Sequence, residues 1–121
     1  MAYIPDKLHL SNSVNGKGIA VSTTVSGLAK LIHTSHSTSG ILDEVWLYAT
    51  NNWTGSATLI LLWGAQPNNE SYLTIPNKAG RYNLADGRLI ASGLSINAFI
   101  DTPHSGAEII VDGFVNRLTY P

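Results

Sequence analysis

The stretch GILDEVWLYATNNWTGSATLILLWG, residues 40–64, is the densest apolar sequence in the chain and decides its fold class. It predicts two long strands, residues 41–50 and 57–63, joined by a polar turn at residues 51–55. Trp53 stands at the tip of this predicted hairpin. Strands of this length and apolar content indicate a protein built from β-sheets.

Both faces of these strands are apolar. Side chains alternate along a strand, so Val45 and Leu47 share one face with Asp43, while Trp46 and Tyr48 share the other. An antiparallel strand with one solvated face should alternate between apolar and polar residues. The second face must therefore be covered, either by the rest of this chain or by another subunit.

The chain has 121 residues and no cysteine. That length predicts one domain that buries roughly two-thirds of its unfolded surface, so it needs no disulfide or structural metal. We expect an N-terminal arm over residues 1–17 and a single sandwich domain over residues 18–121. The absence of cysteine and of a signal-like N-terminus favours a protein made in the cytoplasm.

Charged side chains are scarce, at 12% of residues, against roughly 25% in an average globular protein. The formal net charge is -1, and no basic patch of the kind that binds nucleic acid is visible. The longest uninterrupted apolar run, residues 59–63, is far shorter than the ~20 residues that cross a bilayer. We therefore expect neither nucleic acid nor membrane as a partner, and a near-neutral surface suited to contact with other protein.

Turn signals separate eight or nine predicted strands of an antiparallel β-sandwich, either jelly-roll or immunoglobulin-like. A short strand is also expected within the arm, at residues 7–10. The other segments with strand character are residues 18–26, 28–34, 41–50, 57–63, 71–76, 81–85, 88–91, 95–101 and 107–118. No segment shows a sustained helical period.

Three glycine positions carry specific expectations. Asn15-Gly16 predicts a turn, and Asp86-Gly87 predicts a hairpin, because both central residues of a type I′ turn need positive φ. Gly113, inside the last strand, predicts a bulge or a place where another backbone comes close.

Residues with catalytic or metal-binding chemistry are few. Asp43 shares a face with apolar residues, so its carboxylate needs a partner, for which Arg81, Arg88 or Arg117 would serve. His33 and His36 stand three residues apart in a polar segment with no third ligand nearby, and zinc sites need three or four protein ligands. We expect solvated loop histidines, no metal, no cofactor and no catalytic site.

The aromatic residues fit a contact surface better than a reaction. Trp53 either packs back on its own domain or docks on a partner, since aromatics are enriched where proteins meet. An alternative is that Trp53, with Trp46, Tyr48, Tyr72 and Tyr82, stacks on sugar rings.

The sequence also resembles a known family over residues 18–119. The segments that carry the resemblance are 42–51, LDEVWLYATN, then 59–64 followed by a polar loop, 74–76 with 79–80, 97–99, and the ending 113–117. They are similar to small virion structural proteins of tailed bacteriophages, cyanophages among them. The role proposed for that family is capsid decoration, or cementing.

The resemblance implies a β-sandwich, usually a homotrimer, on the outer capsid surface, where it clamps neighbouring major capsid subunits against internal DNA pressure. The family pattern brings no catalytic residues. On this basis Trp46, Tyr48, Leu62 and Phe114 are predicted at or beside a subunit interface. Capsid or ligand contacts are predicted at Tyr3, Pro5, Trp53 and Asn68. The alternatives are a carbohydrate-binding or receptor-binding fibre module, and a neck or tail protein of the same virion.

Overall fold

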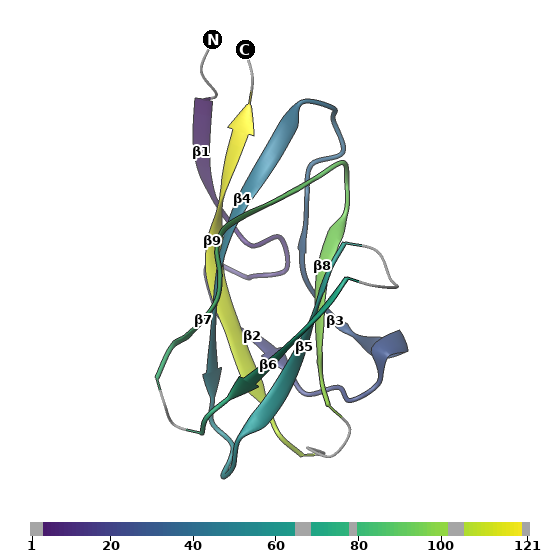
Figure 1. The fold of residues 1–121 in the computed structure, drawn as a ribbon. Helices are drawn as coiled ribbons and strands as arrows, with labels where there is room; N and C mark the ends of the chain where they lie inside the picture. Colours follow the sequence, from purple (N-terminus) through teal and green to yellow (C-terminus); the bar gives the residue numbers. More distant parts are fainter. Residues whose placement is uncertain (1–3, 65–68, 78–79, 102–105, 120–121) are drawn as a thin grey trace.

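The protein is a two-layer sandwich of antiparallel sheets in the computed structural model, which describes residues 4–64, 69–77, 80–101 and 106–119 (Figure 1). The strands of the described residues are β1 (Ile4–His9), β2 (Ile19–Val21), β3 (Lys30–Thr34), β4 (Ile41–Asn51), β5 (Ala57–Trp63), β6 (Glu70–Ile75), β7 (Tyr82–Ala91), β8 (Ser95–Ile100) and β9 (Ile109–Thr119). A single 3-10 turn, η1, spans Ser26–Leu28. The predicted all-β sandwich is confirmed.

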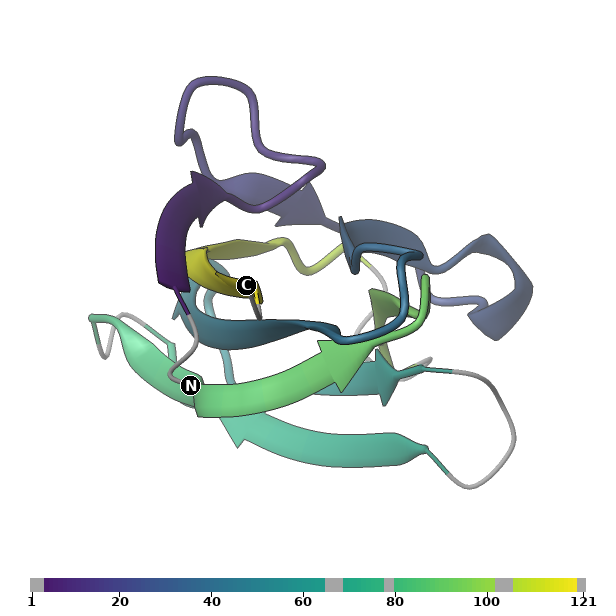
Figure 2. The same cartoon turned by 90° about the horizontal axis from the view of Figure 1, so that it is seen from above.

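One sheet has the order β1-β9-β4-β7, with β2 also paired to β9, and the other has the order β3-β8-β5-β6. Apart from the short β2, the strands pair as a nested set: β1 with β9, β3 with β8, β4 with β7, and β5 with β6. This is the jelly-roll arrangement, the first of the two predicted topologies. Figure 2 shows the two sheets stacked edge-on, with the loop before β2 extending beyond them.

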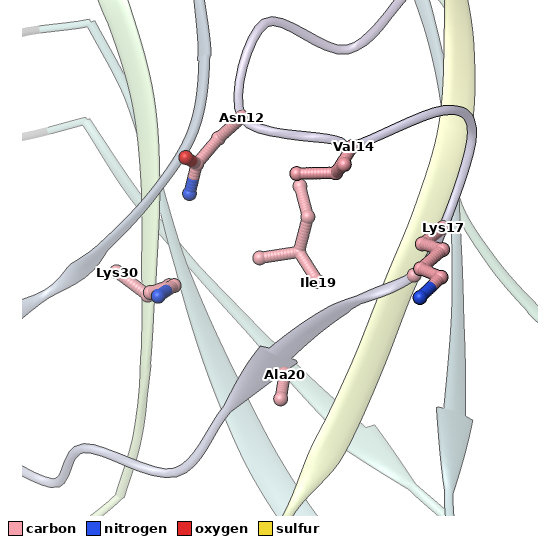
Figure 3. A pocket seen from close by; sticks show the side chains of 7 residues that line it. Asn12, Val14, Lys17, Ile19, Ala20 and Lys30 are labelled. Atoms are coloured by element: carbon pink, nitrogen blue, oxygen red, sulfur yellow. The ribbon is translucent and has the colours of Figure 1, made fainter.

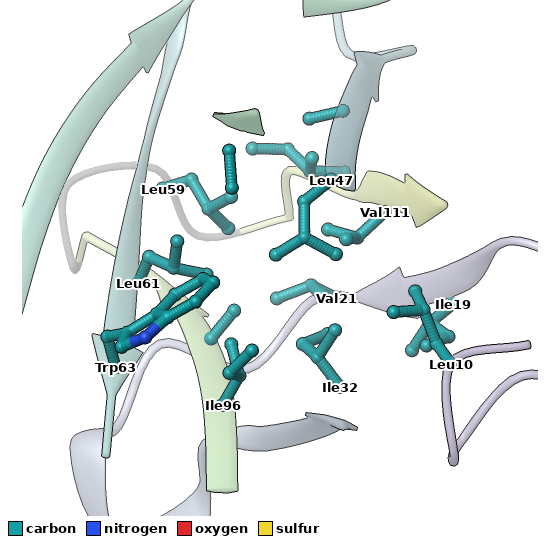
Figure 4. Packing of buried hydrophobic residues seen from close by; sticks show 14 of the residues in the cluster. Leu10, Ile19, Val21, Ile32, Leu47, Leu59, Leu61, Trp63, Ile96 and Val111 are labelled. Atoms are coloured by element: carbon teal, nitrogen blue, oxygen red, sulfur yellow. The ribbon is translucent and has the colours of Figure 1, made fainter. Parts of the chain in front are cut away.

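The core fills the space between the sheets, and Figure 4 shows its side chains interleaved from both layers. As predicted, Val45, Leu47 and Ala49 of β4 point into the core and are fully buried. Leu59 and Leu61 of β5 meet them from the other sheet. The remaining buried members of the cluster are Leu10, Ile19, Val21, Ile32, Ala57, Trp63, Ile75, Ala85, Ile90, Ile96, Ala98, Ile100, Ala107, Ile109, Val111 and Val115.

The predicted hairpin of the 40–64 stretch is wrong, because β4 and β5 belong to different sheets. The side chain of Asn51 is buried at the corner and donates hydrogen bonds to the carbonyls of Gly55 and Ile75, at 3.0 and 2.9 Å. Its Oδ1 accepts one from the amide of Trp53 at 2.9 Å. These bonds hold the turn so that the chain crosses from one layer to the other.

The hairpin predicted at Asp86-Gly87 is also wrong, because β7 is one continuous strand there. Its register on β4 shifts between the Val45–Arg88 and Trp46–Asp86 pairs, which leaves Gly87 as the extra residue of a bulge. Gly87 has a φ of +75°. A bulge of the type that has a glycine at positive φ and a type I′ turn share this backbone requirement, so the same sequence signal fits both.

Two other glycine expectations agree with the structure. Asn15 and Gly16 have φ values of 54° and 82°, and the amide of Lys17 donates to the carbonyl of Val14 at 3.0 Å, which closes the predicted turn. A Cβ on Gly113 would overlap the carbonyl oxygen of Trp46, so the close backbone approach predicted there is present.

The N-terminal segment differs from the expected arm. The strand expected at residues 7–10 instead spans Ile4–His9, and it pairs with β9 over its whole length, from Ile4–Thr119 to His9–Phe114. Residues 4–9 are thus part of a sheet, and Leu10 after them is buried in the core. Both ends of the described chain lie at the same end of the sandwich (Figure 1).

Candidate functional site: the outer sheet faces and a buried ion pair

An aromatic stack crosses the outer face of the β1-β9-β4-β7 sheet. Trp46 of β4 and Phe114 of β9 are cross-strand partners whose rings lie parallel, with centroids 5.0 Å apart and an interplanar angle of 6°. The ammonium of Lys7 lies 4.7 Å from the centroid of Phe114. On the other side, a Cβ on Gly87 would lie 3.1 Å from Cζ2 of Trp46. Each of the four strands therefore contributes one residue to this row. Residues of the same chain contact both rings: Trp46 and Phe114 stack on each other, Lys7 lies over Phe114, and Gly87 lies beside Trp46.

Tyr48 lies on the same outer face and is also covered. The guanidinium carbon of Arg81 lies 4.1 Å from its ring centroid. Arg81 also donates to a carboxylate oxygen of Asp112 at 3.1 Å, in a pair whose side chains are 59% and 35% exposed. Cation–ring contacts of this kind contribute about 0.5–1 kcal/mol when exposed. This face is thus ordered by contacts within one chain.

The outer face of the opposite sheet is apolar at its centre. Ile60 and Leu62 of β5 point away from the core, yet they are only 3% and 5% exposed. Ile60 lies between Tyr72 of β6 and Phe99 of β8. Tyr72 itself is 66% exposed. We call the row Tyr72, Ile60 and Phe99, together with Leu62 and Leu31, the β5 face.

The four residues predicted at a subunit interface do not share one surface. Trp46, Tyr48 and Phe114 lie together on the outer face of the β1-β9-β4-β7 sheet. Leu62 lies on the β5 face, on the opposite side of the sandwich. Their role in an interface stays a prediction.

The predicted capsid or ligand contacts are also separated. Pro5 is exposed on β1, opposite Leu118. Trp53 is partly buried and packs against the core. Tyr3 and Asn68 lie outside the described residues.

The exposed strand edges carry features that discourage pairing with another strand. Pro5 brings no N–H to the edge strand β1. The edge strand β7 has two register shifts against β4, and β3 has one between Leu31 and His33. The edge strand β6 has only six residues and ends just before Pro76. Contacts with partners are therefore more readily made through the sheet faces than along the edges.

A buried cluster of Asp43, Arg117 and His33 links the two sheets: the ion pair lies within one sheet, and the histidine comes from the other. Asp43 is fully buried, and its two carboxylate oxygens accept hydrogen bonds from Nε and Nη2 of Arg117, at 2.8 and 3.0 Å. The second oxygen also lies 2.7 Å from Nε2 of His33, which comes from the other sheet. The structure thus selects Arg117 from the three predicted partners of Asp43.

The expectation of a solvated loop histidine is wrong for His33, which lies in β3 and is 1% exposed. Its Nδ1 accepts a hydrogen bond from the amide of Ser11 at 3.0 Å, so this network assigns the proton to Nε2, which donates to Asp43. Both ring nitrogens are occupied, and the ring is closed to substrate. His36 instead accepts from the amide of Thr38 at 3.0 Å.

Burial by itself raises the pKa of Asp43, because it disfavours a charged carboxylate. The hydrogen bonds from Arg117 and His33 and the charge of Arg117 outweigh burial, so the pKa of Asp43 lies below its ordinary value. The hydrogen bond to Asp43 in turn raises the pKa of Arg117. The charged pair is therefore the stable form.

Within the described residues, no group of three or more His, Asp or Glu side chains could hold a metal ion. No described helix is long and apolar enough to cross a membrane. The sequence did not predict the inward position of His33. Adjacent residues of a regular strand point to opposite faces, so Ile32 and His33 can both be buried only because a bulge lies between Leu31 and His33. The sequence also did not predict the cation–ring contacts, which depend on strand register.

Comparison with known proteins gives no assignment: no family model, no curated protein and no solved structure matches this chain.

Proposed function

We propose that the protein is a non-catalytic structural module of a phage virion, a decoration protein that binds the outside of the head and stabilises contacts between major capsid subunits. The observation that carries the proposal is the pair of apolar or aromatic outer faces, on opposite sides of a sandwich whose edges are blunted. Jelly rolls are common in viral capsids, although a fold does not by itself specify function. The resemblance described above supplies the link to the capsid.

We infer a homotrimer, as the resemblance implies, in which the two faces take part. In a ring of three subunits each interface is heterologous, so two different surfaces of the chain meet. Because the face bearing Trp46 and Phe114 and the β5 face lie on opposite sides of the sandwich, packing one squarely on the other would stack copies in an open row. A closed trimer would therefore join these faces at an angle, through their margins. A stable trimer needs each subunit to bury on the order of 1,000 Å². Exposed apolar side chains such as Tyr72 and Leu31, at 66% and 37%, would lose their water in this contact.

Light scattering after size-exclusion chromatography tests the trimer. We expect three times the chain mass for the wild type at micromolar concentration, and a folded monomer for Tyr72→Glu, because that change places a charge in the apolar contact. Leu28→Glu is the matched control, since Leu28 is 69% exposed on η1, away from both faces. A well-folded wild-type monomer would refute the trimer.

Co-purification tests the capsid role. Heads assembled without the protein should bind it when it is added back, in many copies spread over the head surface. Resistance of the heads to heat or low salt should then rise. Failure to bind assembled heads would exclude decoration, and binding confined to one vertex would favour the neck or tail alternative.

The carbohydrate-binding alternative rests on the exposed rings of Tyr72 and Tyr82, which are 66% and 38% exposed. Trp46 and Phe114 are less suited to it, because their ring faces are occupied by each other and by Gly87 and Lys7. Binding to a glycan array that is lost in Tyr72→Ala would favour this alternative.

A further inference from the structure

Most basic side chains of the protein are already engaged. The chain has seven Lys and Arg residues, of which Lys78 lies outside the described residues. Arg117 pairs with Asp43, and Arg81 pairs with Asp112. The guanidinium carbon of Arg88 lies 4.4 Å from the ring centroid of Trp63, and Lys7 lies over Phe114. The ammonium groups of the other two, Lys17 and Lys30, contact no described residue through a hydrogen bond, ion pair or ring.

These two lysines line the same hollow. Its volume is about 300 Å³, and it lies between the loop before β2 and the start of β3. The lining residues are Asn12, Val14, Lys17, Gly18, Ile19, Ala20 and Lys30. In Figure 3, Lys17 and Lys30 stand on opposite sides of Val14 and Ile19. The lining has two positive charges, an apolar floor and no carboxylate.

The loop that carries Lys17 is held in place. The Asn15-Gly16 turn is closed by a bond from the amide of Lys17 to Val14, and the hydroxyl of Ser13 donates to the carbonyl of Lys17 at 2.7 Å. Asn12 donates through its side chain to the carbonyl of Leu31 at 2.6 Å, which ties the loop to β3. The backbone around the hollow is therefore ordered before a ligand arrives.

We propose that this hollow is a docking site for a carboxylate side chain of a partner protein, presented next to an apolar residue. The ammonium groups of Lys17 and Lys30 would bind the carboxylate from two sides, and Val14 and Ile19 would contact the apolar neighbour. The lining of the hollow specifies a carboxylate on the partner, but it does not specify which protein carries that carboxylate. That the partner is the capsid protein rests on the proposed function.

The test uses the whole chain and a defined probe, a blocked dipeptide of leucine and glutamate, followed by amide NMR shifts. We expect saturable shifts confined to residues 12–20 and Lys30. The matching dipeptide with glutamine should produce none. Lys17→Gln with Lys30→Gln should abolish the shifts, and each single change should weaken binding about tenfold. Lys7→Gln, the same charge change elsewhere on the surface, should leave them intact.

Three results would overturn the proposal: no saturable shift at the hollow, equal binding by the double variant, or tighter binding of inorganic phosphate than of the dipeptide. A parallel measurement adds the same variants to heads that lack the protein. Heads that bind the double variant as tightly as the wild type would overturn the capsid protein as the partner of the hollow. If the wild type does not bind heads, the capsid proposal fails. The dipeptide titration then still shows whether the hollow binds a carboxylate.

Discussion

Replacing Asp43 with Asn should destabilise the protein strongly, because it removes the charge that pairs with Arg117 across the β4–β9 ladder. Breaking a buried pair by removing one partner costs about 3–5 kcal/mol. Asp43 is fully buried, whereas the Arg117 side chain is 24% exposed and can recover some hydration. We therefore expect the lower end of the range, about 3 kcal/mol. This is a large share of the ~5–15 kcal/mol by which domains are stable.

The chain offers a matched control, the Asp112–Arg81 pair on the surface, whose side chains are 35% and 59% exposed. Asp112→Asn makes the same chemical change but should cost no more than about 1 kcal/mol, because exposed pairs are hydrated and screened. Urea unfolding at pH 7, followed by tryptophan fluorescence, measures both. In a separate thermal melt, the melting temperature should fall by about 10 °C in Asp43→Asn and change little in Asp112→Asn.

Equal losses in the two variants would refute the reasoning. They would mean that burial adds nothing to the Asp43 pair, and that the contact from His33 is incidental. A loss in Asp43→Asn that disappears at 1 M salt would refute it too, since a buried pair is screened much less than an exposed one.

Three further outcomes are expected. Because the pKa of Asp43 is lowered in the folded state, its stabilising contribution is complete above the ordinary value of 3.8 and is lost as pH falls through the lower folded value; Asp43→Asn should lack this part of the acid dependence in unfolding measured from pH 7 to 2. Gly113→Ala should cost about 2–4 kcal/mol in urea unfolding, because its Cβ would overlap backbone, whereas Gly27→Ala, with open space around it, should change stability by less than about 0.5 kcal/mol. Phe114→Leu should cost about 1–2 kcal/mol by thermal melting, since leucine keeps apolar area but loses the stack on Trp46 and the Lys7 contact; an unchanged melting temperature would mean that the stack contributes nothing.

The faces of the long strands could be predicted from sequence because alternation is a property of the single strand. Val45 and Leu47 needed no knowledge of their neighbours to be placed in the core. The same alternation placed Asp43 on the apolar face, and a buried carboxylate there needs a charged partner such as an arginine. The choice of Arg117 did not follow from alternation, because it depends on the register of β4 against β9, which places the two residues opposite each other.

The errors arose where one local signal serves two structures. Asp86-Gly87 satisfies the φ requirement of a turn, but here Gly87 forms a bulge that also makes room for the ring of Trp46. The polar turn after β4 fits a hairpin equally well. It becomes a crossing between sheets because buried Asn51 bonds to the carbonyl of Ile75, on a strand that no local pattern links to it. Long-range partners decide such cases, and a single sequence does not display them.

The candidate surfaces were predictable only in part, for a related reason. Strands that are apolar on both faces indicated that the second face must be buried. The sequence could not show how much of that face the chain itself buries and how much a partner would bury. Trp46 and Phe114 largely cover each other, with Lys7 and Gly87 at the two ends of the stack. On the β5 face, Tyr72 is not covered in this way, so a second subunit would bury more apolar surface there than over the aromatic stack.

This asymmetry constrains how copies of the chain can associate. A two-fold dimer through the β5 face would bury Tyr72 against its own copy and leave the aromatic stack of each subunit in water. A heterologous contact buries both faces at once, but it leaves one unused face at each end of any open row. Closing the row into a ring removes those ends, and blunted edges at β1, β6 and β7 prevent growth by strand pairing instead. Because the two faces lie on opposite sides of the sandwich, direct stacking would extend the row, so we propose that the copies meet at an angle and close into a ring of few subunits.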